Sequence, residues 1–275
     1  MSRWVPLLAA AIVAGAWTAP AAIAARGVAT PPKHELQVFA AASLADAFGD
    51  VGRVFERSRE GLVVRLNLAG SQQLAAQLAQ GAVADVFASA DERWMEDVRS
   101  RGLLLRDAAP FAQNRLVVIV PRTNPARIGR LQDLARGGIK LVLGADAVPV
   151  GRYSRMALRS LARSPGFGPD FATRVLRNVV SEEENVKAVA SKVQLGEADA
   201  GIVYHSDVTA SIARFVRVFE LPEGVSPIAS YPIALLRGGS EPDAARAFVQ
   251  LVLSTEGQRI LVRHGLMPRA VPGAP

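Results

Sequence analysis

Apolar and polar positions along this chain follow two alternating patterns. Short apolar runs predict buried strands, and most are followed by a stretch in which apolar residues recur every three or four positions, as in an amphipathic helix. In the first such pair, residues 36–42 form the strand, and Phe48, Val51 and Phe55 share one face of a helix that opens at Ser43. This order predicts parallel strands covered by helices.

The alternation continues in two series. The first predicts strands at 36–42, 63–68 and 86–89, and the second predicts strands at 114–121, 140–143, 175–180 and 202–204. A last strand at 231–236 and helices at 241–253 and 255–264 end the chain. No Gly/Ser linker separates the series, so we expect an α/β fold of two similar three-layer lobes with mixed, mostly parallel sheets, joined by chain crossings that act as a hinge.

The lobes are expected to divide the chain unevenly. Residues 34–115 and 227–275 would form lobe 1, and residues 116–226 would form lobe 2. Residues 1–25 carry Arg3, an apolar run and the small-x-small sequence Ala22-Ile23-Ala24, which together predict a cleaved secretory signal peptide, with an uncleaved anchor as the alternative. The chain has no cysteine, which excludes a lipidated cysteine, so we expect a soluble periplasmic protein.

Charge and motif content exclude several functions. The net charge is +7, but the basic residues are scattered among acids without a basic run, so no nucleic-acid partner is expected. The three histidines lie far apart in the sequence, which argues against a metal site of histidines. GxSxG, Walker A and strand-linked GxGxxG motifs are missing. We therefore predict a protein that is not an enzyme and has no cofactor; an exported hydrolase using Asp85, Asp91 and Glu92 is the alternative.

Five strand ends carry candidate binding residues. Ligands of parallel α/β sheets bind beyond the carboxyl ends of the strands, where the first N–H groups of each following helix lack partners. Hydroxyls and helix-start amides recur there without Lys, Arg or His, which suits a fully ionised oxyanion and rejects a protonated one. The candidates are Ser43, Ser71, Val150, Val186 and Tyr204.

Each candidate also has a purely local explanation. Ser43 could simply cap its helix, with Asp46 as capping-box partner, and Ser71 could cap the next helix. Tyr204 could be a core tyrosine with one hydrogen-bond partner. The oxyanion hypothesis therefore depends on the five positions converging in space.

Seven segments carry a family resemblance, in the family's order, over nearly all of residues 36–266. The chain resembles the periplasmic molybdate-binding proteins of ABC transporters, a branch of the type II solute-binding proteins. That resemblance implies the type II periplasmic-binding-protein fold, a molybdate or tungstate ligand held between closing lobes, and delivery to a membrane permease by a monomer. The segments are VFAAASLADAF (38–48), LAGSQQLAAQL (68–78), GAVADVFASAD (81–91), NRLVVIVP (114–121), VPVGRYSRMAL (148–158), ENVKAVASKVQLGEADAGIVYHSD (184–207) and STEGQRILVRHGL (254–266).

The resemblance also implies a role for each candidate. By position, Ser43 and Ser71 would give hydroxyl and backbone N–H donors, Val150 and Val186 would give backbone N–H, and Tyr204 would give its hydroxyl. Three departures from the family's pattern stand near these positions, and none removes a donor: Val150 where alanine is common, Gly70 where some relatives have serine, and His205 where a small residue is frequent. A receptor for sulfate or another tetrahedral oxyanion stays an alternative, since cavity size cannot be read from the sequence.

Overall fold

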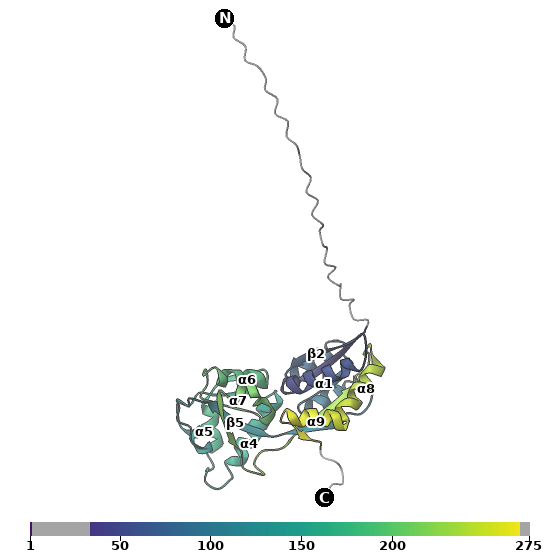
Figure 1. Ribbon diagram of the computed structural model, residues 1–275. Helices are drawn as coiled ribbons and strands as arrows, with labels where there is room; N and C mark the ends of the chain where they lie inside the picture. The colour runs from purple at the N-terminus through teal and green to yellow at the C-terminus, as the bar shows by residue number, and fades with distance from the viewer. Residues whose placement is uncertain (2–33, 270–275) are drawn as a thin grey trace. The chain divides into compact units, whose positions relative to one another are not determined.

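The computed structural model describes Met1 and residues 34–269. The predicted signal peptide, apart from Met1, therefore lies outside the described residues. Residues 34–269 belong to one compact unit that contains two β-sheets with helices packed against both (Figure 1). None of the helices described here has both the length and the apolar character that crossing a membrane requires.

The first sheet has six strands, and the first strand of the chain lies inside it. This strand, β1, runs parallel to its two neighbours β2 and β3. Its side chains alternate between two apolar clusters, with Val38 and Ala40 in one and Phe39 in the other. The order across the sheet is β11 (Met267–Pro268), β4 (Ala109–Asn114), β10 (Ala229–Leu235), β3 (Val86–Ala88), β1 (His34–Ala41) and β2 (Leu62–Ala69).

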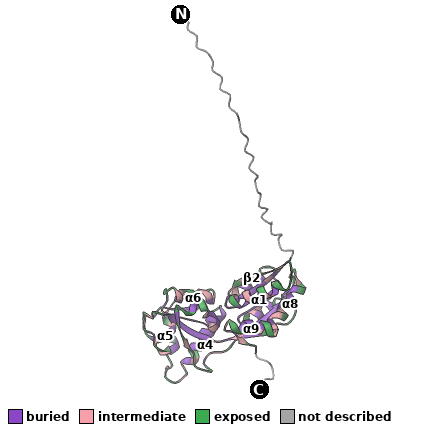
Figure 2. Ribbon diagram, viewed as in Figure 1, coloured by how far each residue is buried: buried purple, intermediate pink, exposed green. Residues whose placement is uncertain are grey.

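Two groups of helices cover this sheet. α1 (Ala45–Arg57), α8 (Pro242–Leu253) and α9 (Thr255–Arg263) pack together, and the rings of Phe48 and Phe55 both meet Phe248 edge-on. The other apolar cluster contains residues of α2 (Ser71–Ala79) and α3 (Glu92–Ser100). Figure 2 shows buried residues in the interior and exposed or intermediate residues on the outward faces of the labelled helices.

The second sheet has five strands, with β8 in the middle and the apolar β5 beside it; every residue of β5 is buried. α4 (Pro149–Leu161) and α6 (Val186–Gln194) pack against it, and a short α5 (Phe171–Arg177) packs on α4. The approach of α6 is close: a Cβ atom on Gly201 would lie 2.9 Å from the side chains of both Val189 and Val193. The order is β7 (Val179–Glu183), β6 (Leu141–Gly144), β8 (Ala200–Tyr204), β5 (Leu116–Pro121) and β9 (Val216–Glu220).

Both sheets are mixed, as predicted, but antiparallel pairs are more frequent than we expected. The described strands form four parallel and five antiparallel pairs. The parallel pairs join β1 to β2 and β3, and β6 to β7 and β8. The antiparallel pairs involve β4, β5, β9, β10 and the terminal β11, because the chain crosses between the sheets at Arg115 and again over residues 221–228, and the crossing strands enter each sheet against its parallel strands.

One predicted strand is wrong. Residues 175–180 contain the end of α5, and the strand β7 begins only at Val179. The side chain of Asn178, between the two elements, donates to the backbone oxygens of Leu134 and Arg136 and so fixes the turn. The short elements η1 (Ala42–Leu44), η2 (Leu131–Ala135), η3 (His205–Asp207) and α7 (Ala210–Ala213) complete the described chain. The predicted lobe boundaries stay a prediction.

Candidate functional site

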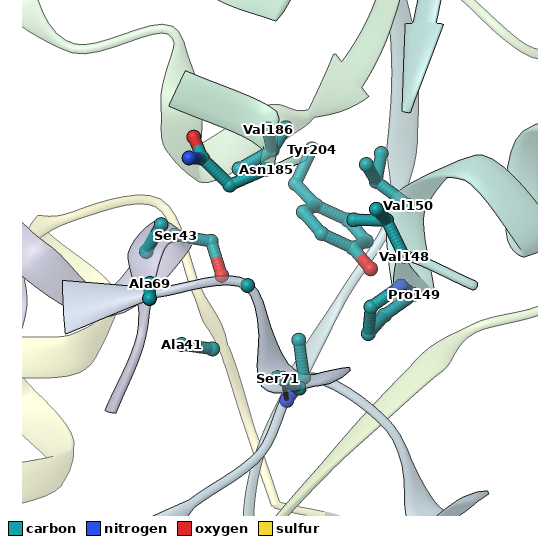
Figure 3. A pocket seen from close by; sticks show the side chains of 13 residues that line it. Ala41, Ser43, Ala69, Ser71, Val148, Pro149, Val150, Asn185, Val186 and Tyr204 are labelled. Carbon is teal, nitrogen blue, oxygen red and sulfur yellow. Dashed lines mark hydrogen bonds between the residues drawn. The ribbon is translucent and has the colours of Figure 1, made fainter. Parts of the chain in front are cut away.

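The five predicted residues meet at one pocket. All five line it, at the ends of strands of both sheets or just after them: Ser43, Ser71, Val150, Val186 and Tyr204 (Figure 3). The reason lies in the strand directions. Each position follows or ends one of the parallel strands β1, β2, β6, β7 and β8, whose carboxyl ends face the same space.

Ser43 lies in a tight turn between β1 and α1. The alternative in which it caps the helix with Asp46 does not hold, because η1 intervenes and α1 begins only at Ala45, without a side-chain cap. The Ser43 hydroxyl instead lies 2.9 Å from the hydroxyl of Tyr231. Asp46 accepts a hydrogen bond from Lys187 at 2.9 Å. The hydroxyl is therefore free of the helix backbone.

Ser71 is the first residue of α2, not its cap. The capping residue is Gly70, whose N–H donates to the side chain of Gln73. The Ser71 hydroxyl oxygen accepts the backbone N–H of Ala90 at 3.0 Å. A backbone N–H can only donate, so this contact leaves the Ser71 hydrogen available to the pocket.

Val150 lies in the first turn of α4, which begins at Pro149. Proline suits the first position of a helix because a backbone N–H there has no acceptor within the helix, so its absence costs nothing. The first N–H groups of a helix have no partner within the helix, so the Val150 N–H is available at the pocket. The side chain of Arg155 fastens this turn by donating to the oxygens of Gly144 and Gly151.

Val186 is the first residue of α6. Asn185 caps this helix, and its side-chain oxygen accepts the N–H of Ala188 at 3.0 Å. Asn185 itself lines the pocket beside Val186. The cap bonds to the N–H of Ala188 and not to that of Val186. The Val186 N–H can therefore donate to an anion at this helix N-terminus.

Tyr204 ends β8, and its side chain is fully buried. Among the described residues its hydroxyl has no hydrogen-bond partner. Burial, and then the nearby Tyr231, raise the pKa of Tyr204 well above its usual value of 10, so the hydroxyl keeps its hydrogen at neutral pH. A buried hydroxyl without a partner costs free energy, and a ligand that accepts its hydrogen would remove that cost.

The pocket has no charged side chain among its lining residues. The cavity volume is about 220 Å³. It is smaller than the roughly 300–1,000 Å³ of pockets for drug-sized ligands, so it suits a small ion better than a large organic substrate. Hydroxyls, amide N–H groups and small apolar side chains form the wall. The positive ends of the helices at this wall supply the favourable potential for an anion.

Polar contacts join the two sheets' elements around the pocket. Trp94 donates its ring N–H to the oxygen of Ala147 at 2.8 Å, and Arg152 pairs with Asp91 at 3.1 Å. Gln72 and Gln73, on the first turn of α2, donate to the backbone oxygen and the carboxylate of Glu184 at 2.7 and 2.9 Å. These contacts hold elements of the two sheets together around the pocket.

Gly70 allows the start of α2 to approach the backbone of Glu184 closely. A Cβ atom there would lie 2.5 Å from the backbone oxygen of Glu184. Its backbone conformation is ordinary, so the glycine is needed for close approach and not for an unusual turn. Serine at this position would require the two segments to separate.

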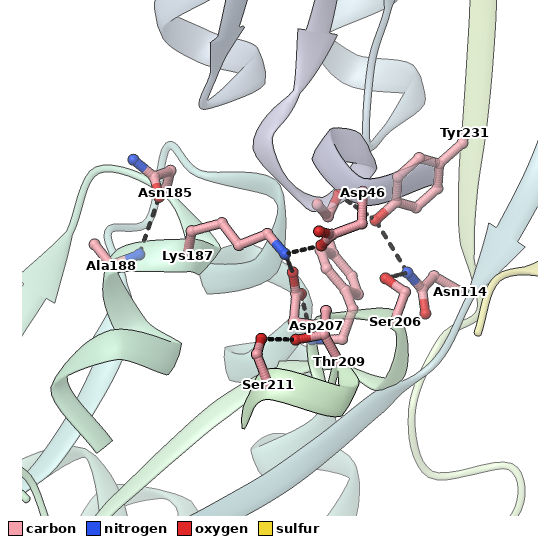
Figure 4. Close-up of polar contacts among 12 residues, drawn as sticks. Asp46, Asn114, Asn185, Lys187, Ala188, Ser206, Asp207, Thr209, Ser211 and Tyr231 are labelled. Carbon is pink, nitrogen blue, oxygen red and sulfur yellow. Dashed lines mark hydrogen bonds and ion pairs between the residues drawn. The ribbon is translucent and has the colours of Figure 1, made fainter. Parts of the chain in front are cut away.

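Lys187 forms a second charged link behind the pocket. Its ammonium lies 2.9 Å from Asp46 and 3.6 Å from Asp207 (Figure 4). Asp207 is fully buried and accepts the N–H of Tyr204 at 3.2 Å. Burial raises the pKa of Asp207 from 3.8 to about 6, and Lys187 opposes part of that rise.

This pKa predicts a pH-dependent stability. Between pH 4 and pH 6 the folded protein keeps a proton on Asp207 that the unfolded chain has released, so Asp207 lowers the free energy of unfolding as the pH rises through this window. The loss should reach about 3 kcal/mol, at 1.36 kcal/mol per pKa unit. Urea unfolding of the wild type and of Asp207→Asn at pH 4, 5, 6 and 7 measures it. The difference in stability between the two proteins should change with pH; parallel pH profiles would contradict the prediction.

The acidic group of the hydrolase alternative is not assembled. Asp85 precedes β3 and accepts the N–H groups of Gln37 and Glu241, whereas Asp91 follows β3 and caps α3. Glu92 accepts the hydroxyl of Ser230 at 2.8 Å. Asp85 is thus held at the opposite end of the strand from the other two acids, and each has a structural partner.

Three residues near the site were not predicted from the sequence. Tyr231 and Asn114 support Ser43 from behind, and Lys187 links Asp46 to Asp207. None of the three stands at the end of a parallel strand. Only their contacts with residues far away in the sequence reveal them, so no local signal could have found them.

The comparisons with known proteins agree on one family. The model of the bacterial extracellular solute-binding protein family matches residues 36–267. The chain is 38% identical to the molybdate-binding protein ModA of Mycobacterium tuberculosis (strain H37Rv) over 269 residues, covering 96% of this chain and 98% of that protein.

Solved structures share the fold. The substrate-binding domain of a putative molybdenum ABC transporter from Clostridium difficile superimposes with a TM-score of 0.63 at 27% identity, covering 86% of this chain and 100% of that one. The sulfate-binding protein SubI of M. tuberculosis H37Rv gives a TM-score of 0.76 at 19% identity, covering 86% and 87%, and so shows the fold alone. With two mixed sheets, a pocket at their strand ends and a family match over most of its length, this chain belongs to the bacterial extracellular solute-binding proteins.

Proposed function

We propose that this protein captures molybdate, or the chemically similar tungstate, in the pocket between its two sheets and delivers it to the membrane permease of an ABC transporter. The observation that carries the proposal is the uncharged wall of the pocket, where hydroxyls and helix-start N–H groups can donate to a ligand. The hydroxyl of Tyr204 has no partner, and that of Ser71 accepts on its far side, so both hydrogens are available to a ligand.

The energies are sufficient without a counter-charge. The three hydroxyls and four helix-start N–H groups, those of Ser43, Ser71, Val150 and Val186, would supply about seven hydrogen bonds to an ionised ligand, each worth roughly 1.5–3 kcal/mol. Their sum exceeds the roughly 8 kcal/mol of a micromolar dissociation constant and leaves a margin for desolvation and closure. A tetrahedral dianion without a proton matches such a wall because every ligand oxygen accepts.

The remaining parts of the proposal follow from this role. The protein acts as a monomeric binding protein, not as an enzyme, and needs no resident cofactor. Export by a cleaved signal peptide, without a lipid anchor, places it in the periplasm, and chain crossings at Arg115 and residues 221–228 act as the hinge between two lobes. The relative from M. tuberculosis, whose name is that of a molybdate-binding protein, supports the choice of ligand.

A melting experiment with a panel of oxyanions tests the proposal. A ligand at about a thousand times its dissociation constant stabilises the folded state by about 4 kcal/mol, which for a chain of this size raises the melting temperature by about 8–16 °C. We expect this rise with molybdate and tungstate and a much smaller one with sulfate or phosphate. A larger rise with sulfate would make the protein a sulfate receptor, and no rise with any oxyanion would refute the proposal.

A further inference from the structure

Tyr231 supports the binding site without lining the pocket. It lies on β10 of the six-stranded sheet, fully buried, and its ring meets that of Tyr204 edge-on at 5.8 Å. Its hydroxyl lies 2.9 Å from that of Ser43. The same hydroxyl lies 3.3 Å from the side-chain nitrogen of Asn114 (Figure 4). Asn114 ends β4, where the chain leaves this sheet for the other.

The direction of these hydrogen bonds is determined at Asn114. Its side-chain oxygen accepts the backbone N–H of Arg115 at 3.0 Å, and a backbone N–H can only donate. The amide nitrogen must therefore face the other way. It donates to the hydroxyl oxygens of Ser206 at 2.8 Å and Tyr231 at 3.3 Å.

The direction continues from Tyr231 to Ser43. The Tyr231 oxygen accepts a hydrogen bond from Asn114. Among the described residues, the Ser43 oxygen is the acceptor within hydrogen-bond distance of the Tyr231 hydroxyl. If Ser43 donated to Tyr231 instead, the Tyr231 hydrogen would be buried without an acceptor, which is unfavourable. Tyr231 therefore donates to Ser43, and the Ser43 hydrogen remains free for the pocket.

We propose that Asn114 and Tyr231 are positioning residues that hold Ser43 as a hydrogen-bond donor and so make the pocket select oxyanions without a proton. This inference rests on the proposed function. A hydrogen-bond chain running from Asn114 through Tyr231 to Ser43 also polarises the last hydroxyl and strengthens its bond to an anion. An anion that carries its own proton, such as hydrogenphosphate, would bring a second hydrogen to a position where Ser43 cannot accept.

Two substitutions act on the chain in different ways. Tyr231→Phe removes the donor to Ser43 and lets the serine hydroxyl turn and accept. Asn114→Asp replaces a donor by an acceptor, since a carboxylate has no hydrogen to give at neutral pH. Tyr231 then donates to Asp, and Ser43 has to donate to Tyr231, away from the pocket. Asn114→Asp should therefore weaken molybdate binding more than Tyr231→Phe does.

The test compares two dianions, molybdate and hydrogenphosphate, at pH 8.5. Calorimetry gives the dissociation constant for molybdate, and competition by millimolar phosphate gives that for hydrogenphosphate. The added charge of Asn114→Asp repels both dianions alike, so it cancels in the ratio of the two constants. We expect the preference for molybdate over hydrogenphosphate to fall about tenfold or more in both variants. In both, the Ser43 hydroxyl can turn and accept the hydrogen of hydrogenphosphate, which it cannot do in the wild type.

Controls separate the possible failures. Tyr153→Phe removes another buried phenol hydroxyl, outside this chain of hydrogen bonds, and should leave the preference unchanged. If the wild type binds neither molybdate nor tungstate, the proposed function fails. If the wild type binds molybdate but Tyr231→Phe keeps the same preference, the positioning role is refuted. Should Asn114→Asp melt too low to be measured, the nearly isosteric Tyr231→Phe decides.

Discussion

Replacing Ser71 by alanine should weaken molybdate binding at least tenfold, and the same holds for Ser43→Ala. Each substitution removes one hydroxyl donor to an ionised ligand, worth roughly 1.5–3 kcal/mol. At Ser71 a second effect adds to the loss, because the N–H of Ala90 loses the acceptor that positions its loop at the pocket. Isothermal titration calorimetry of both variants with molybdate measures the effect.

Ser154→Ala is the matched control for these variants. Ser154 is also buried and lies on α4 close to the pocket, but its hydroxyl donates to the backbone oxygen of Val150 at 2.7 Å. Its hydrogen is already used, so the substitution should lower thermal stability and leave the affinity within about twofold. Unchanged affinity in both Ser43→Ala and Ser71→Ala would remove these serines from the site.

The second large effect is expected at Gly151, in the first turn of α4. A Cβ atom there would lie 2.1 Å from the backbone oxygen of Ala145 and 2.2 Å from that of Gly144. Backbone atoms at the end of a buried strand cannot move as a flexible side chain can, so α4 would have to shift away from β6. We expect Gly151→Ala to lower the free energy of unfolding by about 3 kcal/mol or more. Chemical denaturation measures this loss.

The shift of α4 should also affect binding, because the N–H of Val150 belongs to the same turn. Gly137→Ala provides the comparison: nothing lies within 4 Å of a Cβ atom there, so the change should be nearly neutral or slightly stabilising. Equal stability of the two alanine variants would show that the close approach of α4 to β6 is not required.

Local patterns allowed most elements to be predicted, since apolar periodicity indicates which residues of an element face a core, whichever element packs against them. They failed where a polar side chain had a distant partner. Residues 175–180 have the composition of a strand, yet the helix α5 runs to Arg177 because it packs on α4 and because Asn178 bonds to η2 at Leu134. Ser43 similarly has the composition of a cap, but its hydroxyl oxygen bonds to Tyr231 and not to a backbone N–H of α1.

The order of apolar runs, the turn residues and the hydroxyls at strand ends determined that this chain builds two mixed α/β sheets whose junctions carry Ser43, Ser71, Val150, Val186 and Tyr204. Such features depend on near neighbours in the chain. Only the tertiary structure decided which partner each polar group finds: Tyr231 lies 188 positions from Ser43, and Asp46 lies 141 positions from Lys187. Hydrogen-bond direction and burial arise from contacts between such distant residues, so the donor role of Ser43 and the raised pKa of Asp207 could not be read from sequence order.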